Sequence, residues 1–196
     1  RFAELEHHPV AGSQGADWVM LPMFQTPDEL QAFSRIVAGR APIVALLETA
    51  GALQSLDDWV DTPGLCEVFV GLNDLHLSLG CRFMFEPLGQ GVLDRIAARV
   101  HAQGLRVGFG GIAWLDEGLL LGRDVLAEHL RLGSQAVILS RTFHGGEAVG
   151  SFEDQVRSIR GAESALAART SGQAESDRLH VCKAIEAIAA NLRQAA

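Results

Sequence analysis

Two carboxylates in this sequence stand just after apolar runs. Glu48 follows Ile43–Leu47, and Asp74 follows Val68–Val70 after a glycine turn. An acid at the end of a buried strand is costly unless it is paired, hydrogen-bonded or bound to a cation. Neighbouring strands lie about 4.8 Å apart, so both side chains could reach one ion. Mg²⁺ suits such ligands, because it takes one or two carboxylates with waters and substrate oxygens. The alternative is that one or both acids cap the helix that follows.

Lysine occurs only once in the chain, at Lys183, inside an amphipathic stretch near the C-terminus. Schiff-base chemistry needs a desolvated lysine, and a Walker-type phosphate loop needs the sequence GK[ST]. Neither is available here. An enzyme of this sequence that acts on a carbonyl compound must therefore stabilise the electrons by something other than an imine.

The overall composition excludes several classes of protein. The 196 residues are 48% hydrophobic and carry 16 Lys+Arg against 24 Asp+Glu, a formal charge of −8. This balance argues against nucleic-acid binding, which needs a basic patch. No apolar run approaches the roughly 20 residues that cross a bilayer, so we expect no membrane partner. Three widely spaced cysteines predict neither a disulfide framework nor a zinc site, and we expect a cytoplasmic protein.

Five short apolar runs alternate with helical patterns. The runs occupy residues 18–24, 42–49, 67–71, 106–112 and 135–140. The helical patterns cover residues 26–39, 52–60, 91–103, 125–132 and 152–168. This alternation is typical of βαβ units and an α/β fold, and continuously apolar strands are typical of a parallel sheet buried on both faces. Five units are too few to close an eight-stranded barrel, whereas an open doubly wound sheet fits the number as it stands.

The C-terminal part of the sequence reads as a separate unit. Residues 170–177 are polar and contain a glycine, which predicts a linker after a domain of residues 1–169. A final helix over 179–193 places apolar side chains on one side at helical spacing. We expect residues 170–196 to pack either on their own domain or on a neighbouring subunit.

Three segments resemble one known family. The strings ADWVMLPMF, ALLETAGALQSLDDWVDTPG and EVFVGLNDLHLSLG are similar to the HpcH/HpaI aldolase/citrate lyase family, and the resemblance spans about residues 15–140. It implies a (β/α)8 TIM barrel of the phosphoenolpyruvate/pyruvate-binding type. The five apolar runs would then be strands four to eight. The first three strands would lie upstream of Arg1, or be absent.

The same resemblance implies a metal-dependent reaction. Glu48 and Asp74 would be the ligands of Mg²⁺ or Mn²⁺, and the enzyme would form or break carbon–carbon bonds next to the enolate of a 2-oxo acid. Pyruvate would bind the ion through a carboxylate oxygen and its keto oxygen, with an aldehyde as the second substrate. The cation would stabilise the enolate oxygen as a Lewis acid. This chemistry needs no imine and so agrees with the shortage of lysine. The resemblance also implies a homo-oligomer, because family members are commonly oligomeric.

Further residues are candidates for roles in the site. The backbone of Gly71, Asn73 and Asp74, at a strand-to-helix turn, could hold the substrate carboxylate. Arg1 lies about where the family has a carboxylate-binding arginine, and the alternative is that Arg1 is a frayed terminus. His76 could act as a general base, or it could cap the helix or face solvent.

Two glycines and an arginine near the end of the predicted sheet are candidates for phosphate binding. Gly110 and Gly111 end the fourth apolar run, and Arg141 follows the fifth. In barrels, the loops after strands seven and eight often bind phosphate. The alternative is that the glycines only allow close packing.

The sequence also departs from the family at three positions. Leu72 stands where the family usually has proline, and His76 where it has serine. Met23 replaces the lysine of the acyl-CoA lyases, which favours the aldolase branch. We therefore predict a metal-dependent aldolase, with a non-catalytic carboxylate-binding barrel or a CoA-ester lyase as alternatives.

Overall fold

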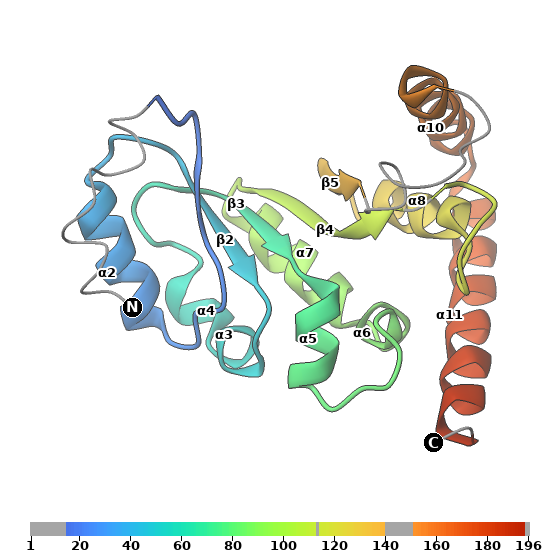
Figure 1. Cartoon of the computed structure of the whole chain (residues 1–196), viewed down its shortest axis with the longest axis horizontal. Coiled ribbons are helices and arrows are strands. Elements are labelled where there is room, and N and C mark those ends of the chain that lie inside the picture. Colours follow the sequence, from blue (N-terminus) through green and yellow to red (C-terminus); the bar gives the residue numbers. More distant parts are fainter. Residues whose placement is uncertain (1–14, 113, 140–150, 195–196) are drawn as a thin grey trace.

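A parallel sheet forms the centre of the chain. The computed structural model describes residues 15–112, 114–139 and 151–194. Its five strands are hydrogen-bonded in the order of the sequence, and every neighbouring pair is parallel (Figure 1). The strands are β1 (Val19–Leu21), β2 (Ile43–Leu47), β3 (Leu65–Val70), β4 (Arg106–Ile112) and β5 (Ala136–Leu139).

The strand order favours one of the two architectures that the sequence left open. A doubly wound sheet reverses its strand order at a switch point, but the order β1-β2-β3-β4-β5 contains no reversal. Successive parallel strands in one direction are the arrangement of a (β/α) barrel wall. Among the described residues β1 and β5 are edge strands, so these five strands are consistent with part of a barrel rather than a closed one.

Helices connect the strands and continue beyond the sheet. The connecting helices before β5 are α2 (Pro27–Val37), α3 (Ala50–Gln54), α4 (Leu56–Trp59), α5 (Leu72–Ser78), α6 (Glu86–Gly89), α7 (Val92–Ala102) and α8 (Gly122–Arg131). The single helix predicted over 52–60 is in fact the pair α3 and α4. Ser55 ends α3, and its hydroxyl donates to the Gly51 carbonyl at 2.9 Å, a side-chain bond that often bends helices.

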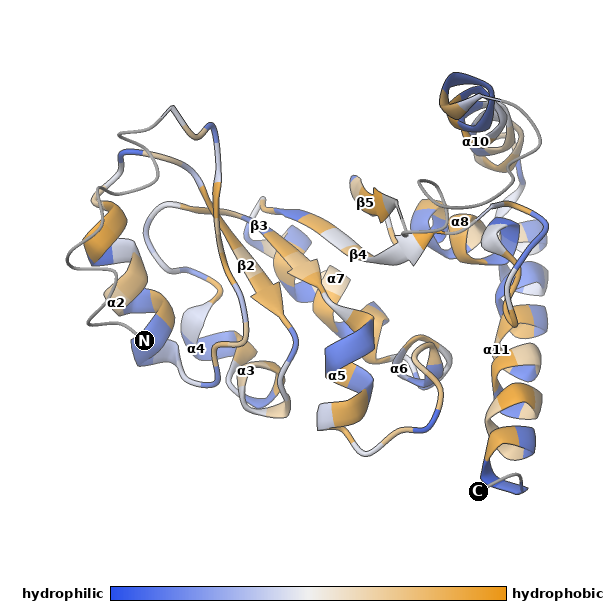
Figure 2. Cartoon of the chain, viewed as in Figure 1, coloured by the Kyte–Doolittle hydropathy of each residue, from blue (hydrophilic) through white to orange (hydrophobic). Residues whose placement is uncertain are grey.

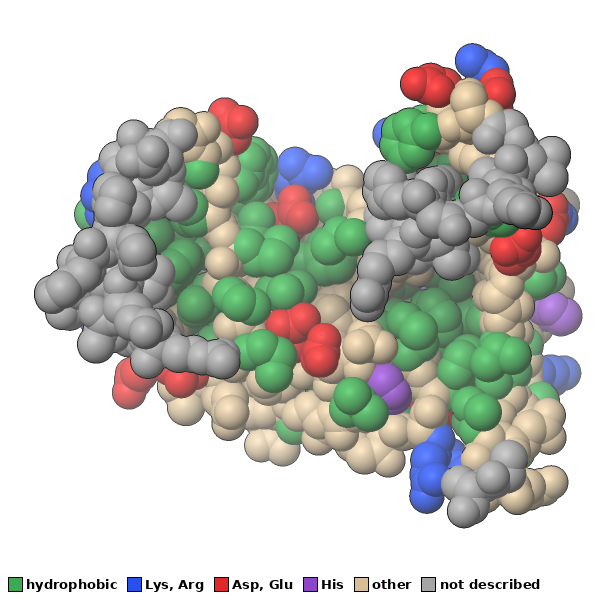
Figure 3. Space-filling model, viewed as in Figure 1, with side chains coloured by type: hydrophobic (Ala, Val, Ile, Leu, Met, Phe, Trp, Pro, Cys, Tyr) green, Lys and Arg blue, Asp and Glu red, His purple; other side chains and the backbone are tan. Residues whose placement is uncertain are grey.

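The main hydrophobic core lies between the sheet and its helices. Val19 and Leu21 of β1 are buried in it, whereas Met20 between them is 41% exposed on the opposite face. Figure 2 colours the strands largely hydrophobic, and Figure 3 shows hydrophobic side chains gathered across that opposite face. The predicted burial of both sheet faces is therefore only partly observed. In a complete barrel this second face would be the interior.

The segment predicted as a linker is helical. After α10 (Phe152–Ala167), residues 171–194 form one helix, α11 (Ser171–Gln194). The prediction of a linker over 170–177 is wrong because Thr170 and Gln173 cap the helix, with the Gln173 backbone N–H donating to Thr170 Oγ1 at 3.2 Å. Although α11 is the longest helix, no helix of the described residues is both long and apolar enough to cross a membrane.

The apolar side of α11 packs on its own chain. Val181, Ile185 and Ala189 are buried, and α11 contacts α6 and α8. At its C-terminal end, Arg193 donates to the buried carboxylate of Glu86 at 2.9 Å. Packing on its own domain, one of the two predicted arrangements, is thus observed. A contact with a neighbouring subunit stays a prediction, and it would use the outward side of α11.

The close approach of β4 to its neighbours can be tested at Gly108. A Cβ at this position would lie 2.6 Å from Phe69 Cδ2 and 2.8 Å from the Ala136 carbonyl oxygen. We expect Gly108→Ala to lower the free energy of unfolding by about 1–3 kcal/mol. Gly161→Ala is the matched control, because Gly161 lies inside α10 with open space around it, and it should raise stability by up to about 1 kcal/mol. Urea unfolding followed by circular dichroism measures both, and equal effects would contradict the packing described.

Candidate functional site

The ends of β2 and β3 bring the two predicted carboxylates to one edge of the sheet. Leu47 and Val70, the last residues of these strands, are paired in register. The Gly71 N–H then donates to the Leu47 carbonyl at 3.0 Å and extends the pairing by one step. Glu48 follows β2 directly, and Asp74 lies in the first turn of α5. The prediction that both acids lie at the same edge is therefore confirmed.

Neither acid caps a helix. The N-cap of α3 is Thr49, whose hydroxyl oxygen accepts the Ala52 N–H at 3.1 Å and donates to the Phe24 carbonyl at 2.6 Å. The N-cap of α5 is Gly71, which has no side chain to serve as a cap. The capping alternative is thus excluded for Glu48 and Asp74. Their carboxylates are therefore not used as helix caps, and they interact with each other.

One backbone donor holds Glu48 in place. The Met23 N–H donates to Glu48 Oε2 at 3.2 Å. Met23 adopts a left-handed conformation, with φ of 57°, which is uncommon for a residue other than glycine and strained. This conformation aims the amide at the carboxylate. The side chain of Met23 is 51% exposed, and it is the backbone of Met23 that makes the hydrogen bond to Glu48.

Gly71 makes room for the Glu48 side chain. A Cβ on Gly71 would lie 2.6 Å from both Glu48 Cγ and Glu48 Oε1. Any other residue here would displace the carboxylate. The sequence predicted that Gly71 helps to bind the substrate. The structure adds a steric reason for glycine at this position, which no sequence pattern indicates.

The two carboxyl groups form an acidic pair that no basic side chain of the described residues neutralises. Burial raises the pKa of Glu48, and the charge of Asp74 and a hydrogen bond with it raise the pKa further, while the Met23 N–H opposes the shift. Glu48 is only 8% exposed. No ion pair within the described residues involves either acid. On the face that holds this edge, Figure 3 shows acidic side chains among hydrophobic ones.

This donor set fits a hard dication. A protein usually supplies one or two carboxylate ligands to Mg²⁺, and waters and substrate oxygens occupy the other coordination positions. Within the described part of the chain, no group of three or more His, Cys, Asp or Glu side chains is arranged to hold a metal. A cation bound by Glu48 and Asp74 would therefore retain open positions for a substrate.

The surroundings of Asp74 differ in part from the expected cradle of amides. The Asp74 N–H donates to the Gly71 carbonyl at 3.3 Å, a long bond within the first turn of α5. Asn73 is exposed at the sheet edge. The binding of a substrate carboxylate by these backbone groups stays a prediction.

His76 is buried in α5 rather than turned to solvent. Its Nδ1 lies 3.1 Å from the Leu72 carbonyl oxygen, four residues earlier. Because a carbonyl only accepts, Nδ1 carries the proton, and in the neutral ring Nε2 holds the lone pair. The role of His76 in catalysis stays a prediction.

The two predicted phosphate-binding glycines lie within β4. Gly110 has a positive φ of 46°, and a Cβ there would lie 3.0 Å from Leu72 Cδ1. Close packing against α5 thus accounts for Gly110, as the alternative proposed. Gly111 belongs to the same strand. Arg1 and Arg141 lie outside the described residues, so their predicted roles have no structural description.

The repulsion between the two acids can be measured in the metal-free protein. We expect Asp74→Asn to lower the pKa of Glu48, and Asp58→Asn, an exposed acid on α4, to leave it unchanged. Because the Glu48 pKa is raised in the folded state, its contribution to stability is present below its ordinary value of 4.5 and is lost as the pH rises through the folded pKa. Asp74→Asn should reduce that loss. Carboxyl ¹³C NMR titration gives the pKa, and an unchanged Glu48 value in Asp74→Asn would contradict the geometry.

Comparison with known proteins bears on the fold. The sequence matches no protein-family model and no curated protein. Solved structures do match. An HpcH/HpaI aldolase/citrate lyase family protein from Burkholderia cenocepacia J2315 aligns with a TM-score of 0.52 and 18% identity over 77% of this chain. A citrate lyase from Burkholderia xenovorans LB400 aligns with a TM-score of 0.53 and 18% identity over 87% of it.

Pyruvate kinase from Cryptosporidium parvum is also similar in structure, with a TM-score of 0.59 and 16% identity over 86% of this chain. The chain spans 65%, 55% and 34% of the lengths of these three proteins, in the order given. At such identities the likeness shows the fold alone. The five-stranded parallel sheet with its helices is thus the same kind of α/β fold as part of these aldolase/citrate lyase family structures.

Proposed function

We propose that this chain belongs to a divalent-metal-dependent carbon–carbon lyase that cleaves or forms aldols between a 2-oxo acid such as pyruvate and an aldehyde. The observation that carries the proposal is the juxtaposition of Glu48 and Asp74 at the carboxyl edge of the sheet, with no basic side chain of the described residues paired to them. In parallel α/β folds this edge is where active sites form. Fold likeness to an aldolase/citrate lyase family protein and a citrate lyase supports it.

Glu48 and Asp74 would hold Mg²⁺ or Mn²⁺. When bound, the cation supplies Lewis acidity for the negative charge that develops on the substrate's keto oxygen. The chain itself supplies the positioning. The Met23 N–H fixes one oxygen of Glu48, and the missing side chain of Gly71 leaves the other free to turn toward Asp74. The Met23 contact reduces the conformational freedom that the Glu48 carboxylate must lose when the cation binds.

Other residues complete the proposed site. The Asn73 amide would bind the substrate carboxylate, with Arg1 as a second carboxylate ligand. His76 would accept a proton at Nε2, since its Nδ1 is bonded to the backbone. Gly111 and Arg141 would bind an acidic or phosphorylated aldehyde. We further propose a cytoplasmic homo-oligomer whose subunits meet on the outward side of α11.

A non-catalytic barrel that binds a small carboxylate is the second candidate. The observation that favours it is the departure from the family pattern at Leu72 and His76, which stand where the family usually has proline and serine. Both candidates bind pyruvate. Only the lyase labilises its methyl protons.

Deuterium exchange separates these candidates. We expect the protein to catalyse exchange of the pyruvate methyl protons in D₂O, followed by ¹H NMR, when Mg²⁺ or Mn²⁺ is present. Glu48→Gln and Asp74→Asn should lower the exchange rate by more than about 100-fold, because each removes a ligand of the cation. Asp58→Asn, which removes an exposed acid of the same type elsewhere, should leave the rate unchanged.

Metal analysis of the same variants checks the cause. Wild-type protein and Asp58→Asn should retain Mn²⁺ through gel filtration at concentrations where Glu48→Gln does not, with circular dichroism showing equal folding. Pyruvate binding without exchange would favour the non-catalytic barrel. Exchange that is equal with and without chelator would contradict the role of the metal.

A further inference from the structure

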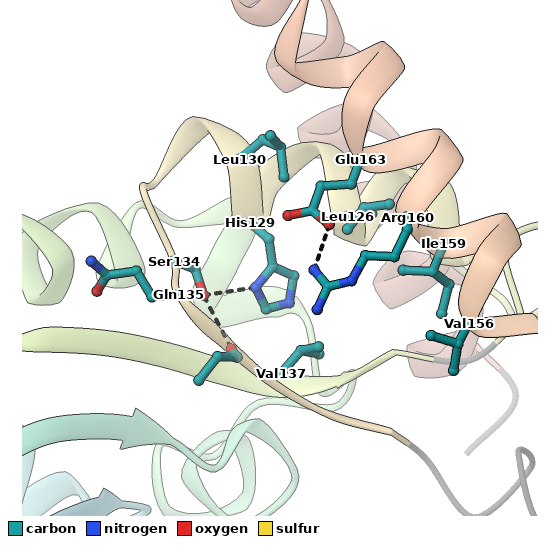
Figure 4. Close-up of a pocket in the computed structure, with 11 residues that line it drawn as sticks. Leu126, His129, Leu130, Ser134, Gln135, Val137, Val156, Ile159, Arg160 and Glu163 are labelled. Atoms are coloured by element: carbon teal, nitrogen blue, oxygen red, sulfur yellow. Dashed lines mark hydrogen bonds and ion pairs between the residues drawn. The ribbon is translucent and has the colours of Figure 1, made fainter. Parts of the chain in front are cut away.

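A second cavity lies away from the paired carboxylates, between α8, β5 and α10 (Figure 4). Its volume is about 400 Å³, within the range of small-molecule sites. None of its lining residues belongs to the Glu48–Asp74 site. The walls are largely apolar, with side chains of Leu126, Leu130, Val137, Val156 and Ile159.

One of the polar residues that line this cavity is His129. It is only 4% exposed, and its ring stacks on Phe109 with the centroids 3.7 Å apart and the planes within 4°. Nδ1 lies 2.8 Å from the hydroxyl oxygen of Ser134, which also donates to the Ala136 carbonyl at 3.2 Å. The stack and this bond fix the orientation of the ring.

The hydrogen bonds of Ser134 define the tautomer of His129. A serine hydroxyl has one proton, and the Ala136 carbonyl takes it. Both bonds form together only when the Ser134 oxygen accepts from the histidine, and in that arrangement Nδ1 carries the proton and Nε2 has an open lone pair. Burial lowers the pKa of His129 to about 4, so the ring is neutral near pH 7.

Nε2 is then a buried acceptor in need of a donor. Within the described part of the chain it has no hydrogen-bond partner. A buried group of this kind normally has one. Arg160 lines the same cavity, and Figure 4 shows it extending from α10 toward the ring. Its guanidinium is bonded instead to Glu163 at 2.6 Å, and its side chain is 74% exposed, so it can turn to admit a ligand.

We propose that this cavity binds a small, uncharged, largely apolar molecule that carries a hydroxyl group, and that the hydroxyl donates to His129 Nε2. The apolar walls would enclose the hydrocarbon part. An anion is disfavoured because the lone pair of Nε2 would face its negative charge, and the one cation among the described wall residues, Arg160, is already paired with Glu163. The proposal does not depend on the proposed lyase activity.

A comparison of phenol with toluene tests the proposal in the full chain. The two rings have nearly the same size and differ in the donor. With histidine labelled by ¹⁵N, phenol should move the Nε2 resonance of His129 toward its hydrogen-bonded position, while toluene should not. We expect phenol to bind about tenfold more tightly than toluene, the effect of one hydrogen bond to a buried acceptor.

Three variants show which group is responsible. His129→Phe keeps the ring stack and should abolish the preference for phenol. Val156→Phe should fill the cavity and weaken both probes while leaving the His129 tautomer intact, so the test survives if His129→Phe fails to fold. Arg160→Ala should retain the preference. The proposal would be overturned by equal affinity for phenol and toluene, or by no binding of either. It would also be overturned if the free wild-type protein already showed a shifted Nε2 resonance and Arg160→Ala removed that shift.

Discussion

The structure depends on two carboxyl groups held together at the carboxyl edge of β2 and β3. Burial and the nearby Asp74 both disfavour the ionised form of Glu48, and folding still places the two acids side by side. A Met23 amide in a left-handed conformation and the absence of a side chain at Gly71 keep them there. An arrangement that disfavours charge without a ligand is what a site for a dication requires, because the cation removes the repulsion when it binds.

The rest of the fold keeps that edge rigid. The Thr49 hydroxyl, just after β2, donates a hydrogen bond to the Phe24 carbonyl. The Phe24 ring in turn packs edge-on against the Trp59 ring, with the ring centroids 5.1 Å apart. The Ala50 N–H donates to the Ser78 hydroxyl at 2.8 Å, which joins α3 to α5. Glu48 and Asp74 are thus carried on elements that are bonded to each other. A rigid support of this kind reduces the reorganisation that accompanies binding of metal and substrate.

Much of this arrangement could be predicted from the sequence, because apolar runs that end at Glu48 and shortly before Asp74 place both acids at strand ends. The strand over Arg106–Ile112 was predicted with the bounds that the structure has. The left-handed Met23 could not be predicted, since its amide contact is with Glu48, 25 residues away in the sequence. The orphaned nitrogen of His129 depends on Ser134 and Phe109, which are brought to it by folding. The first turns of α11, over residues 171–177, were not predicted as helix because their composition is polar, and the cap formed by Thr170 and Gln173 was not recognised in the sequence.

The proposed function depends on a metal site at Glu48 and Asp74, and crystals of the full chain soaked in Mn²⁺ test it most directly. Anomalous difference density at the manganese absorption edge should show a single ion within bonding distance of both Glu48 and Asp74, and the same peak should be missing from Asp74→Asn crystals. An ion bound elsewhere with these two side chains turned apart, or an arginine seated between them, would contradict the account.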